Sequence, residues 1–364
     1  MDATNAALKE LSSYCDMAVR HSYDQYEKHG TLLSKAAIAF RDETVWDEKW
    51  VPDDFDVCDA ASHPVWQRMT REQKLAWNHL QWALDYSAVA QGERQIIVLN
   101  NYAVKEYGDI LPAVVELERR ESFEETDHIS AFTVVLEGIR LRYFKNSKEQ
   151  LWSVSASGFT NETLNRLSRR VMGGVANYLL GSNFPTLFFL ARGMKTHGFK
   201  PFENSICSNE EGHAAMRMIS HLHRLDESRH MATSLNLARL STAVLDTVPK
   251  DNLLLFRMAV QAAFPKGRSA DYRLVYWRRV LDESTIYADI PKEERDALFA
   301  HMESRIHANL ESLHERQTRL TRQANKRIVE ECGLSPRMKK AFVDIMRSDP
   351  AYAATVDAVR LDEH

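Results

Sequence analysis

Residues 218–231 read MISHLHRLDESRHM, and this stretch decides the fold that the sequence predicts. His223, Glu227 and His230 stand at positions i, i+4 and i+7. Because an α-helix turns once every 3.6 residues, this spacing places the three side chains on one helical face. The other positions of that face are apolar or small: Met216, Ile219, Ser220 and Ser234. Ligand-type side chains are costly to bury unless something binds them, so the stretch predicts a core helix that contributes to a metal site.

Length and composition indicate a globular chain built from long helices. The chain has 364 residues, of which 44% are hydrophobic and 27% charged, and its 13 Gly and 10 Pro are few for a fold with many turns. No alternating strand pattern and no internal repeat is visible. We therefore expect an all-α fold in a single helical domain over residues 1–364. Its metal-binding core spans about 65–245, with an N-terminal extension over 1–64 and accessory helices over 246–364.

The charge and cysteine patterns argue against several classes of protein. The net charge is −4, and no basic tract suggests nucleic-acid binding. No apolar run is long enough to span a membrane, and the first residues lack the basic and apolar regions of a secretory signal. The four cysteines are scattered without a C-x-x-C motif, which favours a reducing, cytoplasmic environment and argues against thiolate-bound zinc or iron–sulfur clusters.

Two further helices carry ligand-type side chains on their apolar faces. Thr70 and Gln73 form a capping-box pattern that opens a helix ending at about Tyr107, before Gly108, and this helix carries Glu93. The next helix is predicted from about residue 111 to 144. It contains a Glu-x-x-His pair whose spacing lets both side chains reach one ion, Glu125 and His128. Other helices are predicted over 7–29, 33–42, 161–194, 209–247, 251–264, 269–282, 292–324, 335–347 and 351–361.

Together these residues follow the ligand pattern of ferritin-like carboxylate bundles. Such bundles combine a Glu from one helix with Glu-x-x-His pairs from others, and carboxylates and imidazoles suit a pair of divalent metals. The sequence alone leaves other interpretations open. Glu125 and His128 can belong to a surface charge cluster, Glu93 can be a buried acid in an ion pair, and His223 can be a core histidine without a metal.

The complete pattern resembles the AurF-like diiron N-oxygenases, the family of the p-aminobenzoate N-oxygenase. In that family one helix gives a Glu, the next a Glu-x-x-His, the third a Glu and the fourth a His-x-x-x-Glu-x-x-His. The resemblance covers about residues 65–245 and implies six metal ligands: Glu93, Glu125, His128, His223, Glu227 and His230. The histidine that precedes the second Glu-x-x-His is the feature that separates this family from other bundle oxygenases.

The third helix departs from the family pattern, because residues 171–195 contain no Asp or Glu. The missing position can be taken by Asn183, by Glu203 from the following loop, by water, or by nothing. Metal-bound histidines need an outer hydrogen-bond partner, and Glu121 and Asp226 are candidates for that role. Four residues are candidates for a substrate pocket, in which the arginine would pair with a substrate carboxylate: Tyr86, Tyr178, Asn183 and Arg192.

The resemblance implies a non-haem diiron oxygenase that uses O₂ to oxygenate an amine, either an arylamine or an amino acid. The cofactor would be two iron ions, with manganese not excluded. Electrons would come from an external donor, since no flavin or nicotinamide fingerprint is present. A cytoplasmic homodimer is expected. The alternatives are a diiron C–H hydroxylase or desaturase on the same bundle, and a non-catalytic metal-binding helical protein.

Overall fold

The computed structural model describes residues 3–144, 202–244, 268–306, 330–332 and 336–347, with positions 189, 192, 309 and 334. Every regular element in these residues is helical, which confirms the predicted all-α class. The α-helices are α1 (Ala3–His29), α2 (Leu32–Ala39), α3 (Pro64–Arg68), α4 (Arg71–Tyr107), α5 (Pro112–Tyr143), α8 (Ala214–Val244), α10 (Arg268–Glu283) and α12 (Pro336–Arg347). Residues 202–208 and 292–306 are also helical.

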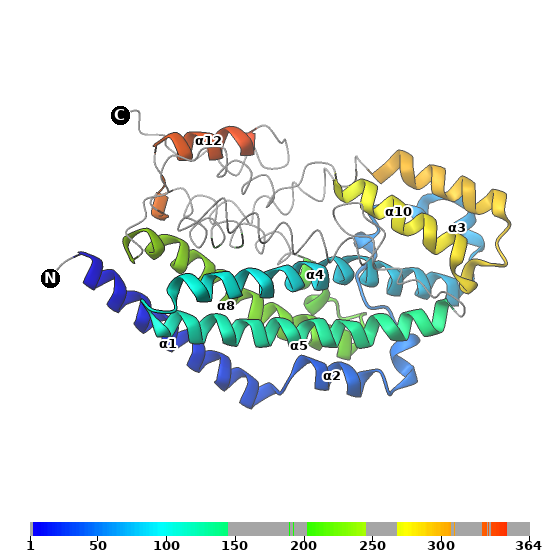
Figure 1. Cartoon of the computed structure of the whole chain (residues 1–364). Coiled ribbons are helices and arrows are strands. Elements are labelled where there is room, and N and C mark those ends of the chain that lie inside the picture. The colour runs from blue at the N-terminus through cyan, green and yellow to red at the C-terminus, as the bar shows by residue number, and fades with distance from the viewer. Residues whose placement is uncertain are drawn as a thin grey trace.

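The longest helices are α4 and α5, which lie side by side along most of their lengths (Figure 1). The predicted capping box opens α4. The Thr70 hydroxyl accepts a hydrogen bond from the Gln73 amide at 3.2 Å, and the Gln73 side chain accepts one from the Thr70 amide at 2.9 Å. The helix ends at Tyr107 before Gly108, as expected, and Pro112 lies in the first turn of α5.

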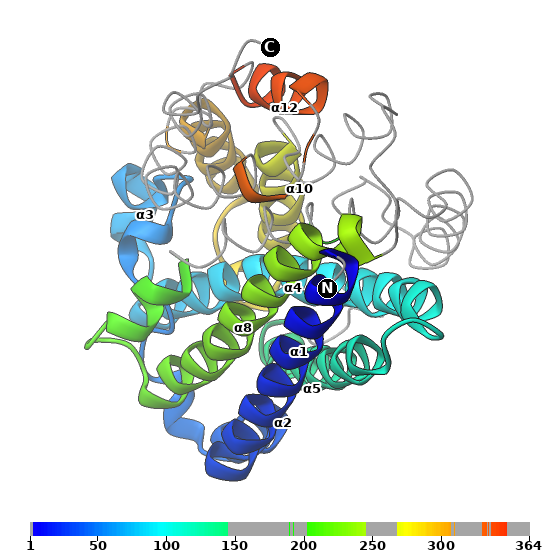
Figure 2. The same ribbon diagram turned by 90° about the vertical axis from the view of Figure 1, so that its left-hand side faces the viewer.

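Helices α1 and α2 pack against α5 and α8, and the turned view shows α1 alongside α8 (Figure 2). Asp127 of α5 fixes the start of α2, because its carboxylate accepts hydrogen bonds from the backbone N–H groups of Leu32 at 2.6 Å and Leu33 at 3.2 Å. A carboxylate at a helix N-terminus is favourable for both charge and hydrogen bonding. Residues 3–39 are therefore packed on the central helices.

The start of α8 differs from the prediction. The sequence predicts a helix over 209–247, but α8 begins at Ala214. Residues 202–208 form a separate helical segment, and a turn follows in which the Gly212 amide donates to the Asn209 carbonyl at 3.0 Å. The imidazole of His213 then accepts a hydrogen bond from the Ala215 amide at 3.2 Å and acts as the cap. This interruption places Glu203 on its own segment, beside α8.

Two apolar clusters fill the interior at opposite ends of the long helices. On α4 the first includes Ala90 and the second Ala103. Along α8 the first cluster again comes before the second in the sequence, whereas along α5 the second cluster comes before the first. The ligand-type residues of all three helices lie between the two clusters, so a polar layer crosses an otherwise apolar core. None of the described helices is long and apolar enough to cross a membrane.

Several predictions fall outside the described residues. These are the helices over 161–194, 251–264 and 351–361, and the end of the helix predicted over 292–324. The division into a core and two flanking parts stays a prediction.

Candidate metal centre

Three helices bring the six predicted ligands together. Glu93 comes from α4, Glu125 and His128 from α5, and His223, Glu227 and His230 from α8. Their ligand atoms form two groups, within each of which all atoms lie within 4.8 Å of one another. The first group is Glu93, His128, His223 and Glu227, and the second is Glu125, Glu227 and His230. Glu227 belongs to both, so the arrangement suits two metal ions that share a carboxylate.

The first group is centred on Glu93. Its Oε1 lies 2.9 Å from Nε2 of His223 and 3.4 Å from Nδ1 of His128. Oε1 of Glu227 is 3.9 Å from Nε2 of His223. All of these side chains are buried except Glu227, which is 20% exposed. Two carboxylates and two imidazoles therefore converge on one point from three helices.

The second group is centred on His230. Its Nδ1 lies 3.2 Å from Oε1 of Glu125 and 3.2 Å from Oε1 of Glu227. The other oxygen of Glu125 is 3.8 Å from Nδ1 of His128, which connects the second group to the first. Three described side chains contribute to this group, against four in the first.

Several ligand atoms are buried without a hydrogen bond, which is costly in a folded protein. They are Oε2 of Glu93, Oε2 of Glu125 and Nδ1 of His128. Carboxylate oxygens and imidazole nitrogens are ligands for iron, manganese and other divalent metals. The donor set therefore fits a pair of metal ions, which would satisfy these atoms.

Each of the three histidines has its second nitrogen held by an acid. Nε2 of His128 is 2.9 Å from Asp226, Nε2 of His230 is 2.8 Å from Glu124, and Nδ1 of His223 hydrogen-bonds to Glu203. The remaining nitrogen of each ring faces the ligand groups. A carboxylate behind a metal-binding histidine fixes the orientation of its ring and makes it a stronger ligand. The arrangement thus has the outer partners that a metal site requires.

Arg229 joins two of these outer acids. Its guanidinium donates to Glu124 at 2.8 and 3.0 Å and to Asp226 at 2.6 Å. Helix α1 adds to the same network, since Ser22 donates to Glu124 and Gln25 donates to Asp226 at 2.7 Å. The N-terminal helix thereby supports the orientation of His128 and His230, although the resemblance stated above began only at about residue 65.

The other predicted site residues have varied positions. Asp226 contacts His128 as expected, whereas Glu121 pairs with Arg192. Arg192 was expected to face a substrate carboxylate, but it is buried in ion pairs with Glu121 and Glu125.

Tyr86 is fully buried and hydrogen-bonds to Glu203 and Ser220. Glu203 lies behind His223. Tyr178 and Asn183 lie outside the described residues.

Glu124 and Arg229 belong to the site, but no sequence pattern singled them out. Both are direct neighbours of predicted residues, in the segments EETDH and DESRH. In the sequence Glu124 is one of several neighbouring acids, among them Glu121 and Glu125. Its burial depends on α1, which covers this side of α5, and no local pattern shows that contact.

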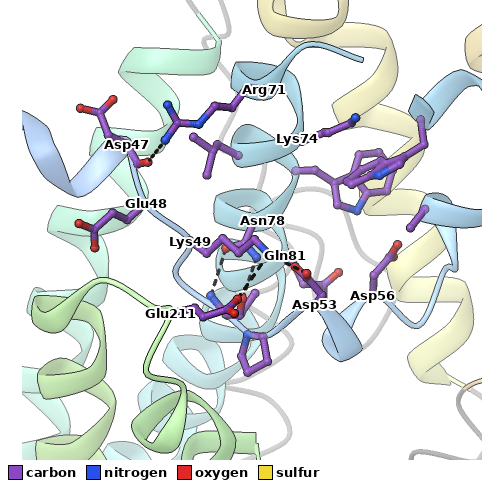
Figure 3. A pocket seen from close by; sticks show the side chains of 16 residues that line it. Asp47, Glu48, Lys49, Asp53, Asp56, Arg71, Lys74, Asn78, Gln81 and Glu211 are labelled. Carbon is purple, nitrogen blue, oxygen red and sulfur yellow. Dashed lines mark hydrogen bonds and ion pairs between the residues drawn. The ribbon is translucent and has the colours of Figure 1, made fainter. Parts of the chain in front are cut away.

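A surface pocket of about 670 Å³ lies at the N-terminal end of α4 (Figure 3). Trp66, Trp77, Asn78 and Gln81 line it together with charged residues such as Lys49. Glu93 lies about 18 Å further along α4 than Gln81, at 1.5 Å per residue. The buried rings of Trp82 and Tyr86 occupy the intervening helix. This pocket is therefore separate from the metal centre.

The acids around the centre change the pKa values of its histidines. Burial alone lowers the pKa of a histidine, but Glu203 and Glu93 outweigh this effect and raise the pKa of His223 to about 10. The pKa values of His128 and His230 are also raised by their acidic neighbours. The metal-free centre therefore holds protonated histidines in ion pairs, and these protons must leave when a metal binds.

This proton balance predicts opposite pH dependences for the metal-free and the metal-loaded protein. The raised pKa of His223 stabilises the metal-free fold fully below pH 6.5, and that stabilisation is lost as the pH rises towards 10. We expect the free energy of unfolding in chelator to fall over this window in urea titrations. With saturating Mn²⁺ the free energy should rise instead, because binding needs neutral imidazoles. A His223→Gln variant should show a smaller fall in chelator. Equal slopes with and without metal would contradict the assignment.

A family model described as acyl halogenase CylC-like matches residues 16–183. The chain is similar to the CylC-like acyl halogenases. The matched segment contains Glu93, Glu125 and His128 and ends before α8, which supplies the other three predicted ligands. No curated protein and no solved structure matched the chain in the other two comparisons.

The match indicates an oxidative enzyme, and the buried Glu and His cluster is consistent with metal dependence. It does not confirm the narrower assignment to the p-aminobenzoate N-oxygenase family. An amine as the substrate, iron as the metal and a homodimer stay predictions.

Proposed function

We propose that this protein is an O₂-dependent oxidative enzyme with two metal ions, which we take to be iron, and that it oxidises a C–H bond of an acyl substrate. Halogenation, in which chlorine or bromine replaces the hydrogen, is the reaction to test first. The proposal rests on one observation: two sets of predicted ligands, from different parts of the chain, lie together in one centre. Glu93, Glu125 and His128 lie in the segment similar to acyl halogenases, and α8 places His223, Glu227 and His230 against them.

The first ion would be held by Glu93, His128, His223 and Glu227, and the second by Glu125, Glu227 and His230. An iron pair supplies the activation of O₂ and the oxidising equivalents, which amino acid side chains cannot provide. The chain itself orients the imidazoles through Asp226, Glu124 and Glu203. An external electron donor is part of the proposal.

Aromatic side chains favour an apolar substrate near the centre. The ring of Phe132 lies 5.1 Å from that of His223 and 6.3 Å from that of His128. Tyr86 lies 4.8 Å from Phe132 and 6.1 Å from His223. These buried rings exclude water from one side of the ligand groups. An acyl chain suits such surroundings better than a charged amino acid does.

The polar groups of the centre support the same choice. The guanidinium of Arg192 pairs with Glu121 and with the predicted ligand Glu125. These two ion pairs occupy the cation with which the carboxylate of an aminobenzoate substrate would have to pair.

N-oxygenation of an amine is the second candidate. It is favoured by the His-x-x-x-Glu-x-x-His arrangement of α8, in which His223 lies in the first ligand group. That arrangement defines the resemblance to the p-aminobenzoate N-oxygenase family. The two candidates use the same ligands and differ in the atom that is oxidised.

Product analysis separates these reactions. Iron-loaded protein with a chemical reductant and O₂ should convert fatty acids or their thioesters into products in which chlorine or bromine replaces hydrogen. Mass spectrometry identifies these products by their isotope patterns, and they should disappear when halide is omitted. Arylamines and amino acids serve as the competing substrates. Oxygen gain on an amine, without any need for halide, would overturn halogenation and support the second candidate.

A further inference from the structure

Arg192 is a buried cation in direct contact with one of the two ligand groups. It is 4% exposed. Its Nη1 donates to Oε2 of Glu121 at 2.6 Å, and its Nη2 donates to Oε1 of Glu125 at 2.9 Å. The same oxygen of Glu125 lies 3.2 Å from Nδ1 of His230. The guanidinium therefore shares a ligand oxygen with the second group.

The first group has different neighbours. The contacts of Glu93 described above are with the imidazoles of His128 and His223. Behind these rings stand two more acids, Asp226 and Glu203. Among the described residues the first group has four side chains and the second has three. Both groups have outer carboxylates behind their histidines, but Arg192 pairs with a ligand carboxylate of the second group.

Arg192 lies in the segment 171–195, which contains no Asp or Glu. Its guanidinium brings a positive charge to Glu125. A cation beside a metal position repels the ion, and the repulsion is strong where water is excluded.

We propose that Arg192 makes the two metal positions unequal, so that the first group binds its ion tightly and the second binds its ion weakly. This inference rests on the proposed metal-dependent function. The guanidinium competes with the second ion for Glu125, whose Oε1 is already in a charge-assisted hydrogen bond. Oε2 of Glu125 is buried without a hydrogen bond and remains as the ligand atom for that ion. Arg192 is a positioning residue, and loading is sequential.

Titration with Mn²⁺ under anaerobic conditions tests the proposal without any assay of activity. Calorimetry of the full chain should resolve a first binding step at least about 100-fold tighter than the second, as expected for one repelled charge in a site of low dielectric. Electron paramagnetic resonance should show an isolated Mn²⁺ spectrum at one equivalent and spin coupling only when the second ion enters. Two equal steps would overturn the inference.

The variant that isolates the contact is the double substitution Arg192→Met with Glu121→Gln. It removes one positive and one negative charge, so the net charge of the protein is unchanged. The second step should tighten by at least about tenfold while the first changes by less than about threefold, since the ligand that the guanidinium contacts among the described residues, Glu125, belongs to the second group. An unchanged second step in a folded double variant would overturn the proposal.

Two single variants keep the test decisive if the double variant fails to fold. Arg192→Lys preserves the charge and should leave the second step weak. Glu121→Gln removes one of the acids that pair with the guanidinium, so the second step should weaken further. Tightening of that step in Glu121→Gln would overturn the inference. Failure of the proposed function has a different signature, since Mn²⁺ would then bind no better to the wild type than to a Glu227→Ala variant.

Discussion

Replacing Glu227 with alanine is expected to abolish metal loading at both positions. Among the described residues, Glu227 is the one that the two ligand groups share, with Oε1 3.2 Å from Nδ1 of His230 and 3.9 Å from Nε2 of His223. Replacing an outer hydrogen-bond partner of a metal ligand lowers metal affinity by up to about 100-fold. Loss of a ligand that both ions would share should lower the affinity by at least that factor. Metal analysis of the purified, reloaded protein measures the effect.

The fold should survive this substitution, because the Glu227 side chain is 20% exposed and lies at the edge of the buried network. Circular dichroism should therefore be unchanged. Glu137→Ala is the matched control, since Glu137 is an exposed glutamate of α5 whose partner is the nearby Arg140. It should bind metal like the wild type. Full metal content in Glu227→Ala would remove the basis of the shared-ligand assignment.

Replacing Arg229 with leucine is expected to cost about 3–5 kcal/mol of folding stability, the range for removal of one partner from a buried ion pair. Arg229 is 8% exposed and contacts two buried acids, Glu124 and Asp226. Without it these acids are left with far less positive charge nearby. Urea denaturation of the metal-free protein measures the loss.

Metal binding should weaken as well. Glu124 and Asp226 hold the outer nitrogens of His230 and His128, so their displacement should lower metal affinity by about 10- to 100-fold. Arg229→Lys keeps the charge but cannot form the paired hydrogen bonds, and should fall between the wild type and Arg229→Leu. Arg224→Leu on the same helix is the control, with an expected change within about 0.5 kcal/mol. Equal stability of Arg224→Leu and Arg229→Leu would refute the role given to Arg229.

Local sequence patterns predicted much of the fold. The capping box at Thr70, Gly108 and Pro112 marked the ends of α4 and α5 closely, because these residues act through their own turns. The start of α8 was less predictable. The chain turns at Gly212, and the His213 amide donates to the carbonyl of Lys49, a contact distant in sequence.

The sequence by itself determined which side chains share a helical face, because helical periodicity depends only on spacing. His223, Glu227 and His230 were therefore identifiable, as were Glu93, Glu125 and His128. Only the tertiary structure decided what stands behind them. Glu124 rather than Glu121 holds His230, Arg192 pairs with Glu125, and α1 reaches the outer acids. These contacts join helices far apart in the chain, and the spacing within one helix carries no information about which neighbour covers it.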